Sequence, residues 1–313
     1  MPAAILRCIE ERAESVRFPA LKRAAAALSE AYRNGRVASR LDVPQEDLVT
    51  AYLVTRMPAT YAAASVVLRE LRLRLGATRV TSLLDIGAGT GAATLAARES
   101  FPGVDQITLI ERDPSFIEAA RVWLPEAAVR VEDFSGVREF PEHDLVVAAY
   151  ALGELAEEAA ITTALRLWTA ARVALVIIEP GTPRGFAFVK NLRSRLLDAG
   201  ARMVAPCPAE TPCPMADPDW CHFAARVERS SLHRRLKDAE LGYEDEKFSY
   251  LAVAKAVVEL PPARILRRPQ HHPGWITLET CQGEALTSVR VTRRDRELFR
   301  AARHVAWGDE WKS

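Results

Sequence analysis

Hydrophobic positions along the chain change their spacing near residue 80. Before that point they recur every three or four residues, as in residues 61–75 (YAAASVVLRELRLRL), which predicts an amphipathic helix that ends at Gly76. Residues 24–28 are rich in alanine, and Pro44 followed by acidic residues is typical of a helix start. We therefore expect residues 1–75 to form an N-terminal helical region.

From residue 80 onward, short apolar runs alternate with longer stretches of helical spacing. Strands are predicted at residues 82–86, 106–110, 128–131, 144–149 and 173–178, and helices at residues 92–99, 114–124, 154–171 and 184–199. This alternation predicts an α/β domain, a parallel sheet with helices on both faces. We place this domain at residues 76–260 and treat residues 261–313 as a basic C-terminal segment.

A glycine-rich turn, DIGAGTG, follows the first predicted strand and leads into a helix. A turn this tight needs residues without Cβ, both for positive φ and for close approach of a ligand to the backbone. The helix N-terminus behind it offers free N–H groups to a ligand of negative character. Asp85, Gly87, Gly89 and Gly91 are therefore candidate cofactor-binding residues.

Two acidic residues after the next strands extend this candidate pocket. Glu111 lies twenty residues beyond Gly91, where a carboxylate can accept both ribose hydroxyls of an adenosine cofactor. Asp133 follows the third strand, where it can reach an adenine amino group. The G-x-G-x-G spacing differs from the G-x-G-x-x-G of dinucleotide folds. The pattern resembles the S-adenosylmethionine (SAM)-binding half of class I, Rossmann-like SAM-dependent methyltransferases. NAD, and glycines that serve only the turn geometry, are the alternatives.

No catalytic residue is identified. Residues 148–154 (AAYALGE) lack the Asn/Asp-Pro-Pro-Tyr clamp of many nucleic-acid amino-methyltransferases, so transfer to an exocyclic amine is not indicated. Tyr150 and Glu154 are candidates for a substrate mouth, although Glu154 equally suits the first turn of a helix. Cys207 follows the helix after the fifth strand, which is a poor position for the attacking thiol of transfer to cytosine C5.

Four of the five cysteines form a pattern. Cys207, Cys213 and Cys221 lie in a proline-rich loop, residues 205–223, and Cys281 follows after 59 intervening residues. Proline disfavours helix and sheet, so this loop needs another source of order. Three thiols within 15 residues of a chain expected to be reduced indicate a bound metal. Cys8, on a predicted helix, is expected to be a core residue.

Four thiolates suit either zinc or an iron–sulfur cluster. Structural zinc sites commonly use tighter C-x2–4-C pairs, whereas long, unequal spacing with proline after Cys207 and Cys213 favours the cluster. A zinc site, and cysteines that are unligated or disulfide-bonded, remain alternative interpretations of the four-cysteine pattern. His222 is a possible substitute ligand. The sequence thus predicts a cysteine-rich metal-binding insertion.

The 313 residues carry a formal net charge of +1, but unevenly. The net charge is +5 over residues 1–79, −6 over 80–200, −2 over 201–263 and +4 over 264–313. Basic ends thus flank an acidic middle. Apolar runs are too short for a membrane span. Residues 1–18 hold Glu10, Glu11 and Glu14 and no apolar run, so we expect no targeting segment and a cytoplasmic, bacterial-type location.

Several longer motifs make the sequence similar to one family. They are residues 179–186 (EPGTPRGF), 205–208 (APCP), 219–223 (DWCHF), 243–250 (YEDEKFSY) and 307–309 (WGD). Together they resemble the methyltransferase-like assembly protein of the mitochondrial small ribosomal subunit and its bacterial relatives. The resemblance covers roughly residues 45–313.

This resemblance implies a class I methyltransferase fold that binds small-subunit rRNA during assembly. It also implies a four-iron cluster, [4Fe-4S], because Cys207, Cys213, Cys221 and Cys281 fall on the pattern of the mitochondrial members. Some of those members act as assembly factors without demonstrated methyl transfer. Arg184, which follows the fifth strand, is a candidate for phosphate contact.

Two basic stretches give RNA binding local support. Arginines recur in residues 290–303, and a second basic run, residues 226–237, is predicted to lie on a helix. The leading hypothesis is a SAM-binding, iron–sulfur protein acting on small-subunit rRNA or a pre-ribosomal particle. The competitors are a non-catalytic assembly factor and a zinc-stabilised small-molecule methyltransferase.

Overall fold

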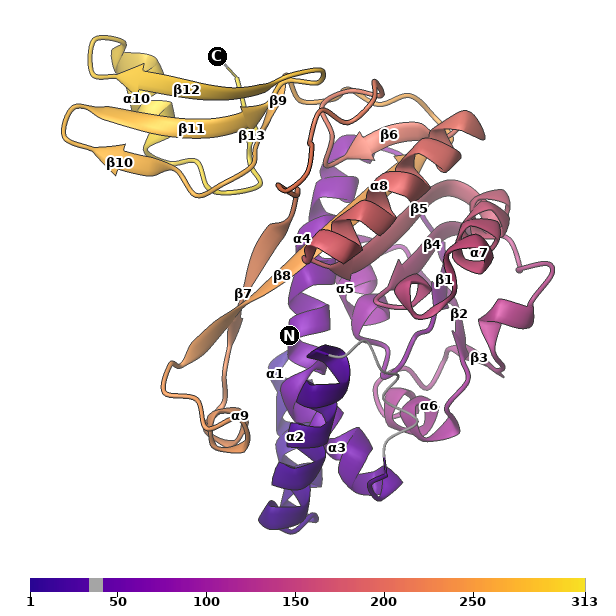
Figure 1. The fold of residues 1–313 in the computed structure, drawn as a ribbon. Coiled ribbons are helices and arrows are strands. Elements are labelled where there is room, and N and C mark those ends of the chain that lie inside the picture. Colours follow the sequence, from indigo (N-terminus) through magenta and orange to yellow (C-terminus); the bar gives the residue numbers. More distant parts are fainter. Residues whose placement is uncertain (34–41, 313) are drawn as a thin grey trace.

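The computed structural model describes residues 1–33 and 42–312. Its first part is helical, with α1 (Ala3–Glu14), α2 (Phe18–Arg33), α3 (Gln45–Thr55) and α4 (Met57–Leu75) (Figure 1). α4 ends where predicted, because Gly76 adopts a φ of +57° that terminates the helix. Apolar side chains of all four helices are buried, and these helices occupy the region that the sequence predicts to be helical.

The central sheet follows. Its strands are β1 (Ser82–Ile86), β2 (Gln106–Glu111), β3 (Ala128–Val131), β4 (His143–Ala149), β5 (Ala171–Pro180), β6 (Arg202–Ala205), β7 (Phe223–Glu228) and β8 (Tyr243–Ala254). The order is β3-β2-β1-β4-β5-β8-β6, with β7 paired to β8. The first five strands are parallel, and β8 runs antiparallel between β5 and β6. This is the strand arrangement of class I methyltransferases, as predicted.

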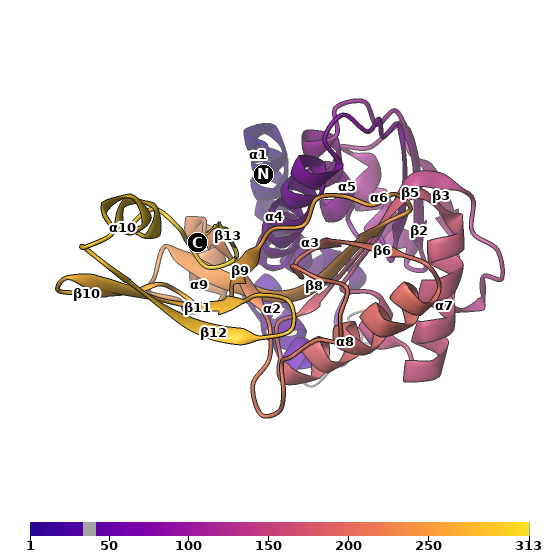
Figure 2. The same ribbon diagram turned by 90° about the horizontal axis from the view of Figure 1, so that it is seen from above.

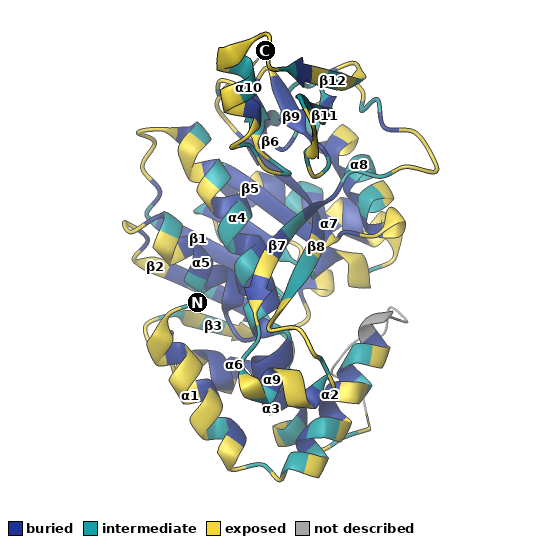
Figure 3. Ribbon diagram, turned by 90° about the vertical axis from the view of Figure 1, so that its left-hand side faces the viewer, coloured by how far each residue is buried: buried dark blue, intermediate teal, exposed yellow. Residues whose placement is uncertain are grey.

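Helices cover both faces of this sheet. α5 (Ala92–Ser100) and α6 (Pro114–Arg121) share one core with α3 and α4, whereas α7 (Glu157–Ala170) and α8 (Pro183–Asp198) pack on the other face. Neighbouring residues such as Leu83 and Leu84 point into different cores because side chains alternate along a strand. Both are fully buried, and Figure 3 shows the buried strands between the helical layers.

A long hairpin leaves the central sheet. The first half of β8 pairs with β7, and the connection between them carries the short helix α9 (Ser231–Leu236). The hairpin reaches down to the N-terminal helices α2 and α3, which α9 contacts (Figure 1). The helix predicted for residues 226–237 is therefore largely wrong, since strand residues alternate through residue 228 before the short helix begins.

The C-terminal residues, for which the sequence predicts only a basic segment and no strands, form a second sheet. It comprises β9 (Ala263–Ile265), β10 (Gln270–His272), β11 (Trp275–Cys281), β12 (Leu286–Thr292) and β13 (Glu310–Trp311), with α10 (Arg296–Ala302). Its own apolar core includes Ile276, Leu278 and Trp311. Figure 2 shows this sheet beside the main one. Within the described residues, no helix has the length and apolarity to cross a membrane.

Candidate functional site

The glycine turn between β1 and α5 has the conformation that its sequence predicts. Gly87, Gly89 and Gly91 have φ values of +62°, +53° and +78°. A Cβ on Gly87 would lie 2.7 Å from the Ala151 Cβ, and one on Gly91 would lie 2.6 Å from Leu124 Cδ1. A Cβ on Gly89 would meet nothing closer than 3.7 Å. Packing therefore excludes a side chain at Gly87 and at Gly91, whereas a Cβ at Gly89 would make only ordinary contacts.

The structure brings Glu111 to this turn. Its Oε2 accepts the Gly89 N–H at 2.9 Å, and its Oε1 accepts the Asp113 N–H at 3.0 Å. Burial raises the pKa of Glu111, and those two N–H donors oppose the rise. A carboxylate can accept about four hydrogen bonds, so capacity remains for the hydroxyls of a ribose.

The other two predicted acids have structural partners. Asp85 is 1% exposed, and its carboxylate accepts the Thr94 hydroxyl at 2.6 Å, which ties α5 to β1. Burial raises the pKa of Asp85 to about 7. Asp133 is exposed and accepts the Ser135 N–H at 2.9 Å, and the Ser135 hydroxyl, together with this N–H, lowers the pKa of Asp133. Asp85 thus supports the turn from within, and Asp133 caps the short helix that follows β3.

Side chains that the sequence did not single out also contact this turn. The Tyr52 hydroxyl, from α3, lies 3.7 Å from the point that a Cβ on Gly89 would occupy, and its ring meets Phe116 edge-on at 4.9 Å. Trp123 Nε1 donates to the Thr90 carbonyl at 2.9 Å. The N-terminal helical region therefore covers the glycine turn. No short-range pattern signals this, since Tyr52 lies far from the turn in sequence.

Tyr150 directly follows β4, at the same edge of the sheet as the glycine turn that follows β1. It has a φ of +57°, and its hydroxyl donates to Glu246 Oε1 at 3.0 Å. Glu246 in turn pairs with Arg56 at 3.2 Å. Burial raises the pKa of the Tyr150 phenol well above its usual value, and the negative charge of Glu246 adds to that effect. The candidate substrate mouth is thus joined to β8 and to the start of α4.

Glu179, at the end of β5, is a second buried acid at this edge. It is 2% exposed, and its Oε1 accepts the Gly153 N–H at 2.9 Å. A Cβ on Gly153 would approach Glu179 Oε2 to 2.6 Å, so the carboxyl needs glycine there. Burial raises the pKa of Glu179 to about 8, with a smaller contribution from Glu154. Glu154 itself pairs with Arg112 at 3.0 Å.

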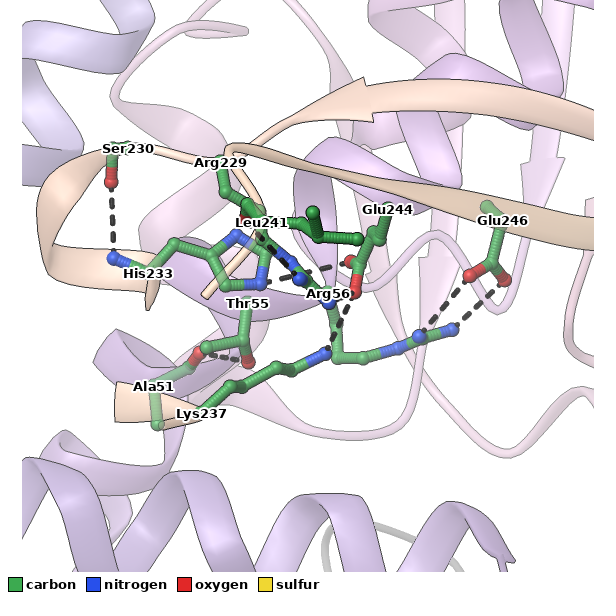
Figure 4. A network of polar contacts seen from close by, with 10 residues as sticks. All are labelled: Ala51, Thr55, Arg56, Arg229, Ser230, His233, Lys237, Leu241, Glu244 and Glu246. Carbon is green, nitrogen blue, oxygen red and sulfur yellow. Dashed lines mark hydrogen bonds and ion pairs between the residues drawn. The ribbon is translucent and has the colours of Figure 1, made fainter. Parts of the chain in front are cut away.

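A polar network fixes the hairpin beside α3 and α4 (Figure 4). Glu244 accepts Arg229 Nη2 at 2.6 Å and lies 3.5 Å from Lys237 Nζ and 3.7 Å from His233 Nε2. Burial lowers the pKa of His233, which leaves the imidazole neutral near pH 7. Glu246, two residues after Glu244 on β8, forms the ion pair with Arg56 in the same view. The hairpin is therefore held in place close to Tyr150.

The four predicted cysteine ligands line one cavity of about 50 Å³. Burial raises the pKa of Cys207 to about 11 and also raises those of Cys221 and Cys281, and the other three thiols add to the rise at Cys221. Across the described residues, no set of three or more His, Cys, Asp or Glu side chains has the geometry of a metal site. The structure thus gathers the four cysteines without giving them ligand geometry.

Two buried arginines hold the cysteine loop. Arg193 Nη2 donates to the Ala209 and Thr211 carbonyls, both at 2.8 Å. Arg264 donates to the Pro206 carbonyl at 2.9 Å and to Glu70 at 2.7 Å. Arg193 therefore ties the loop to α8, and Arg264 ties it, through Glu70, to α4. Both guanidinium groups lie on the wall of the cysteine cavity, where they would offset the charge of thiolates.

Three other residues singled out in the sequence are not part of the cysteine cavity. His222 stacks on Trp220, with ring centroids 5.1 Å apart, and lies outside the residues that line the cysteine cavity. Cys8 is exposed on α1, so its assignment to the core is wrong, because it falls between the buried positions Ile5 and Ile9. Arg184 is exposed in the first turn of α8.

Solved structures of two methyltransferases are similar to the chain. The plantazolicin methyltransferase BpumL is 12% identical with a TM-score of 0.45, over 81% of this chain and 100% of that one. The magnesium protoporphyrin IX methyltransferase of Synechocystis PCC 6803 is 11% identical with a TM-score of 0.42, over 63% of this chain and 84% of that one. At these values neither likeness bears on ligand or reaction.

Curated relatives are similar over most of the chain. The human protein "Ribosome assembly protein METTL17, mitochondrial" is 27% identical over 84% of this chain and 62% of its own length. Two Rsm22-cox11 tandem proteins of Schizosaccharomyces pombe, also mitochondrial, are 24% identical over 83% of this chain and 42% of theirs. The chain therefore spans less than two thirds of the length of these relatives.

These names overturn the expected cytoplasmic, bacterial-type location. The human relative, the two Schizosaccharomyces pombe relatives and the matching family description are designated mitochondrial. The expectation rested on the composition of residues 1–18, which does not determine the compartment. It is wrong.

The family model described as "Mitochondrial small ribosomal subunit Rsm22" matches residues 45–312, which include the glycine turn, the hairpin, the cysteine loop and the second sheet. The chain belongs to the Rsm22 family.

Proposed function

We propose that this chain binds SAM at the glycine turn and acts on or beside small-subunit rRNA during assembly of the small ribosomal subunit. Membership of the Rsm22 family supports the ribosomal partner, and the relative named a ribosome assembly protein points the same way. The observation that carries the cofactor assignment is the contact between Glu111 and the Gly89 N–H at 2.9 Å, in a turn of three glycines with positive φ.

The residues of the turn suit an adenosine cofactor. Gly89 has no Cβ to block its backbone, and Glu111 is a buried acid with raised pKa that would gain from two hydroxyl donors. Asp133, exposed two residues beyond β3, is the candidate contact for adenine. SAM, when bound, supplies an electrophilic methyl group. Asp85 would act only indirectly, by holding α5 and the turn through Thr94.

The acid and the phenol at the mouth are mostly protonated near pH 7, because burial raises the pKa of Glu179 to about 8 and that of Tyr150 well above its usual value. The Tyr150 phenol can therefore donate a hydrogen bond but not take up a proton, and only a minor fraction of Glu179 is ionised at pH 7. Methyl transfer here would depend chiefly on positioning of a substrate that is already nucleophilic.

The hydrogen bonds of Tyr150 and Glu179 favour a second candidate function, a non-catalytic assembly factor. The Tyr150 hydroxyl is engaged by Glu246 and the Glu179 carboxyl by Gly153, so neither group is free to act on a substrate without rearrangement. In that case cofactor binding would stabilise the fold, and the RNA-binding surfaces would carry the function.

We also propose that Cys207, Cys213, Cys221 and Cys281 hold a [4Fe-4S] cluster. Support comes from the all-thiol donor set on one cavity and from the flanking Arg193 and Arg264. Small movements of the cysteine loop would be needed to reach ligand geometry. Zinc is the alternative occupant, and it would leave the protein colourless.

Calorimetric titration with SAM tests the cofactor assignment. Binding to the metal-loaded chain is expected, with roughly tenfold or greater weakening in Glu111→Ala because hydrogen bonds to a charged group are lost. Glu118→Ala is the matched control, an exposed acid on α6. Absence of binding to the metal-loaded chain would eliminate the enzyme and leave the assembly factor.

A further inference from the structure

The second sheet has two unlike faces. Along β11, Ile276 and Leu278 are buried in the core under α10, whereas Trp275, Thr277 and Glu279 alternate with them on the opposite face. β10 and β12 flank β11, so this opposite face is three strands wide. Figure 2 shows these strands and α10 at one side of the molecule.

An aromatic and cationic stack lies on that face. His272 is paired with Trp275 in the sheet register, and their rings stack at 4.9 Å with an interplanar angle of 17°. The Arg290 guanidinium, from the strand on the other side, lies 4.1 Å from the centre of the indole. His272 and Arg290 are exposed, so the stack presents planar groups to solvent.

Arginines without carboxylate partners lie on β12, in the turn after it and on α10, which packs on the other face of the sheet. Among the described residues, none of the following exposed arginines forms an ion pair: Arg290, Arg293, Arg294, Arg296, Arg300 and Arg303. The Arg293 N–H bonds the Gly274 carbonyl at 3.1 Å, which places this basic turn directly beside Trp275. Residues 264–313 carry a net charge of +4, so the surface complements a polyanion.

The same strand leads from the stack to the cysteine cavity. Cys281 ends β11 on the face of Trp275, and both Cys281 and its cross-strand partner Leu286 line the cavity. Six residues at about 3.3 Å each separate the two ends by roughly 20 Å. Glu279, the acid between them, accepts the Ser288 hydroxyl at 2.8 Å.

We propose that this face binds single-stranded RNA, with unpaired bases stacking on His272, Trp275 and Arg290 and phosphates contacting the arginines of the β12–α10 turn. Stacking platforms next to basic side chains recognise single strands, because bases in a duplex are already stacked on one another. The inference rests on the proposed function and specifies its RNA partner as an unpaired segment.

The test is binding of a short fluorescent single-stranded RNA of mixed sequence to the full metal-loaded chain, followed by anisotropy. Trp275→Ala is expected to weaken binding by roughly tenfold or more, and Trp275→Phe to restore most of it, because stacking needs an aromatic ring rather than indole. A duplex of the same sequence is expected to bind more weakly and to be insensitive to Trp275→Ala. Circular dichroism establishes that each variant is folded.

Charge is tested separately with Arg293→Glu/Arg294→Glu, against Arg79→Glu, an exposed arginine just before β1. The double variant is expected to lower the slope of log K against log[salt] by about 1.4, since each lost phosphate contact on a single strand contributes about 0.7, and the control to leave the slope unchanged. Wild-type affinity in Trp275→Ala, or equal competition by duplex RNA or polyglutamate, would overturn the inference. If the wild type binds small-subunit rRNA and these variants do so equally well, this surface is excluded while the proposed function stands. If the wild type binds no RNA, both the proposed RNA-binding surface and the proposed function are contradicted.

Discussion

The Tyr150 hydroxyl donates to Glu246 Oε1 across 3.0 Å, and this bond connects the end of β4 to the hairpin strand β8. Three residues farther along β8, Ser249 Oγ donates to the Cys221 carbonyl at 2.9 Å. One strand therefore contacts both the candidate substrate mouth and the cysteine loop.

Removing the Tyr150 hydroxyl is expected to destabilise the protein modestly. Tyr150→Phe deletes one buried hydrogen bond while Glu246 keeps its ion pair with Arg56, so the free energy of unfolding should fall by about 1 kcal/mol. Urea denaturation measures the change. Tyr243→Phe, at a partly exposed tyrosine on the same strand, is the control, and an equal effect in both variants would contradict the role of this bond.

Glu179 should make stability depend on pH. Its pKa is about 8 in the folded state against 4.5 as the ordinary value, so between these limits the folded state holds a proton that the unfolded state has lost. Stability from this group therefore falls as pH rises from about 4.5 to 8. Glu179→Gln lacks this titration, so its stability relative to wild type should increase from pH 5 to pH 8 in urea denaturation. A constant difference between the two proteins across that range would refute the assignment.

Two glycines of the same turn should respond differently to alanine. Both have positive φ, but a Cβ at Gly87 lies 2.7 Å from the Ala151 Cβ, whereas a Cβ at Gly89 has 3.7 Å of clearance. Gly89→Ala should cost about 1–2 kcal/mol from backbone strain alone, and Gly87→Ala clearly more because of the added overlap. Thermal denaturation of the two variants compares them directly. A larger loss in Gly89→Ala would be inconsistent with the packing described.

The cysteine site predicts a selective loss of metal. Cys281→Ser should lower bound iron and sulfide, and should also loosen the cysteine loop from β11, since Cys281 alone of the four comes from the second sheet. Cys8→Ser is the matched control, because Cys8 is exposed on α1, away from the cavity. Iron and acid-labile sulfide are quantified after anaerobic purification. Full metal content in Cys281→Ser would remove Cys281 from the ligand set.

The central sheet was predictable because its signals are local. β1 and β3 have the bounds expected from apolar runs, and the turn at Gly87–Gly91 follows from glycine's access to positive φ. The second sheet was missed although Trp275–Cys281 alternates clearly between buried and half-buried residues. Residues 275–281 (WITLETC) hold only two aliphatic side chains, Ile276 and Leu278, so the period of two that indicates a strand is weak in the sequence.

The candidate site was only partly predictable, for a different reason. Glu111 and the four cysteines follow from spacing after recognisable strands and prolines. Tyr52 and Glu246 reach the site from other parts of the chain through tertiary packing, and no local pattern encodes such contacts. Asp85 has the expected position but bonds Thr94, because a fully buried carboxylate satisfies itself within the turn.

Crosslinking to RNA in cells, with comparison of methylation at the crosslinked nucleotides with and without the gene, tests the central claim most directly. Crosslinks should concentrate in unpaired segments of small-subunit rRNA. Loss of methylation there on deletion would establish the enzyme, and unchanged methylation would establish the assembly factor. Crosslinks scattered over unrelated RNAs, with none enriched in the small-subunit rRNA, would contradict the account.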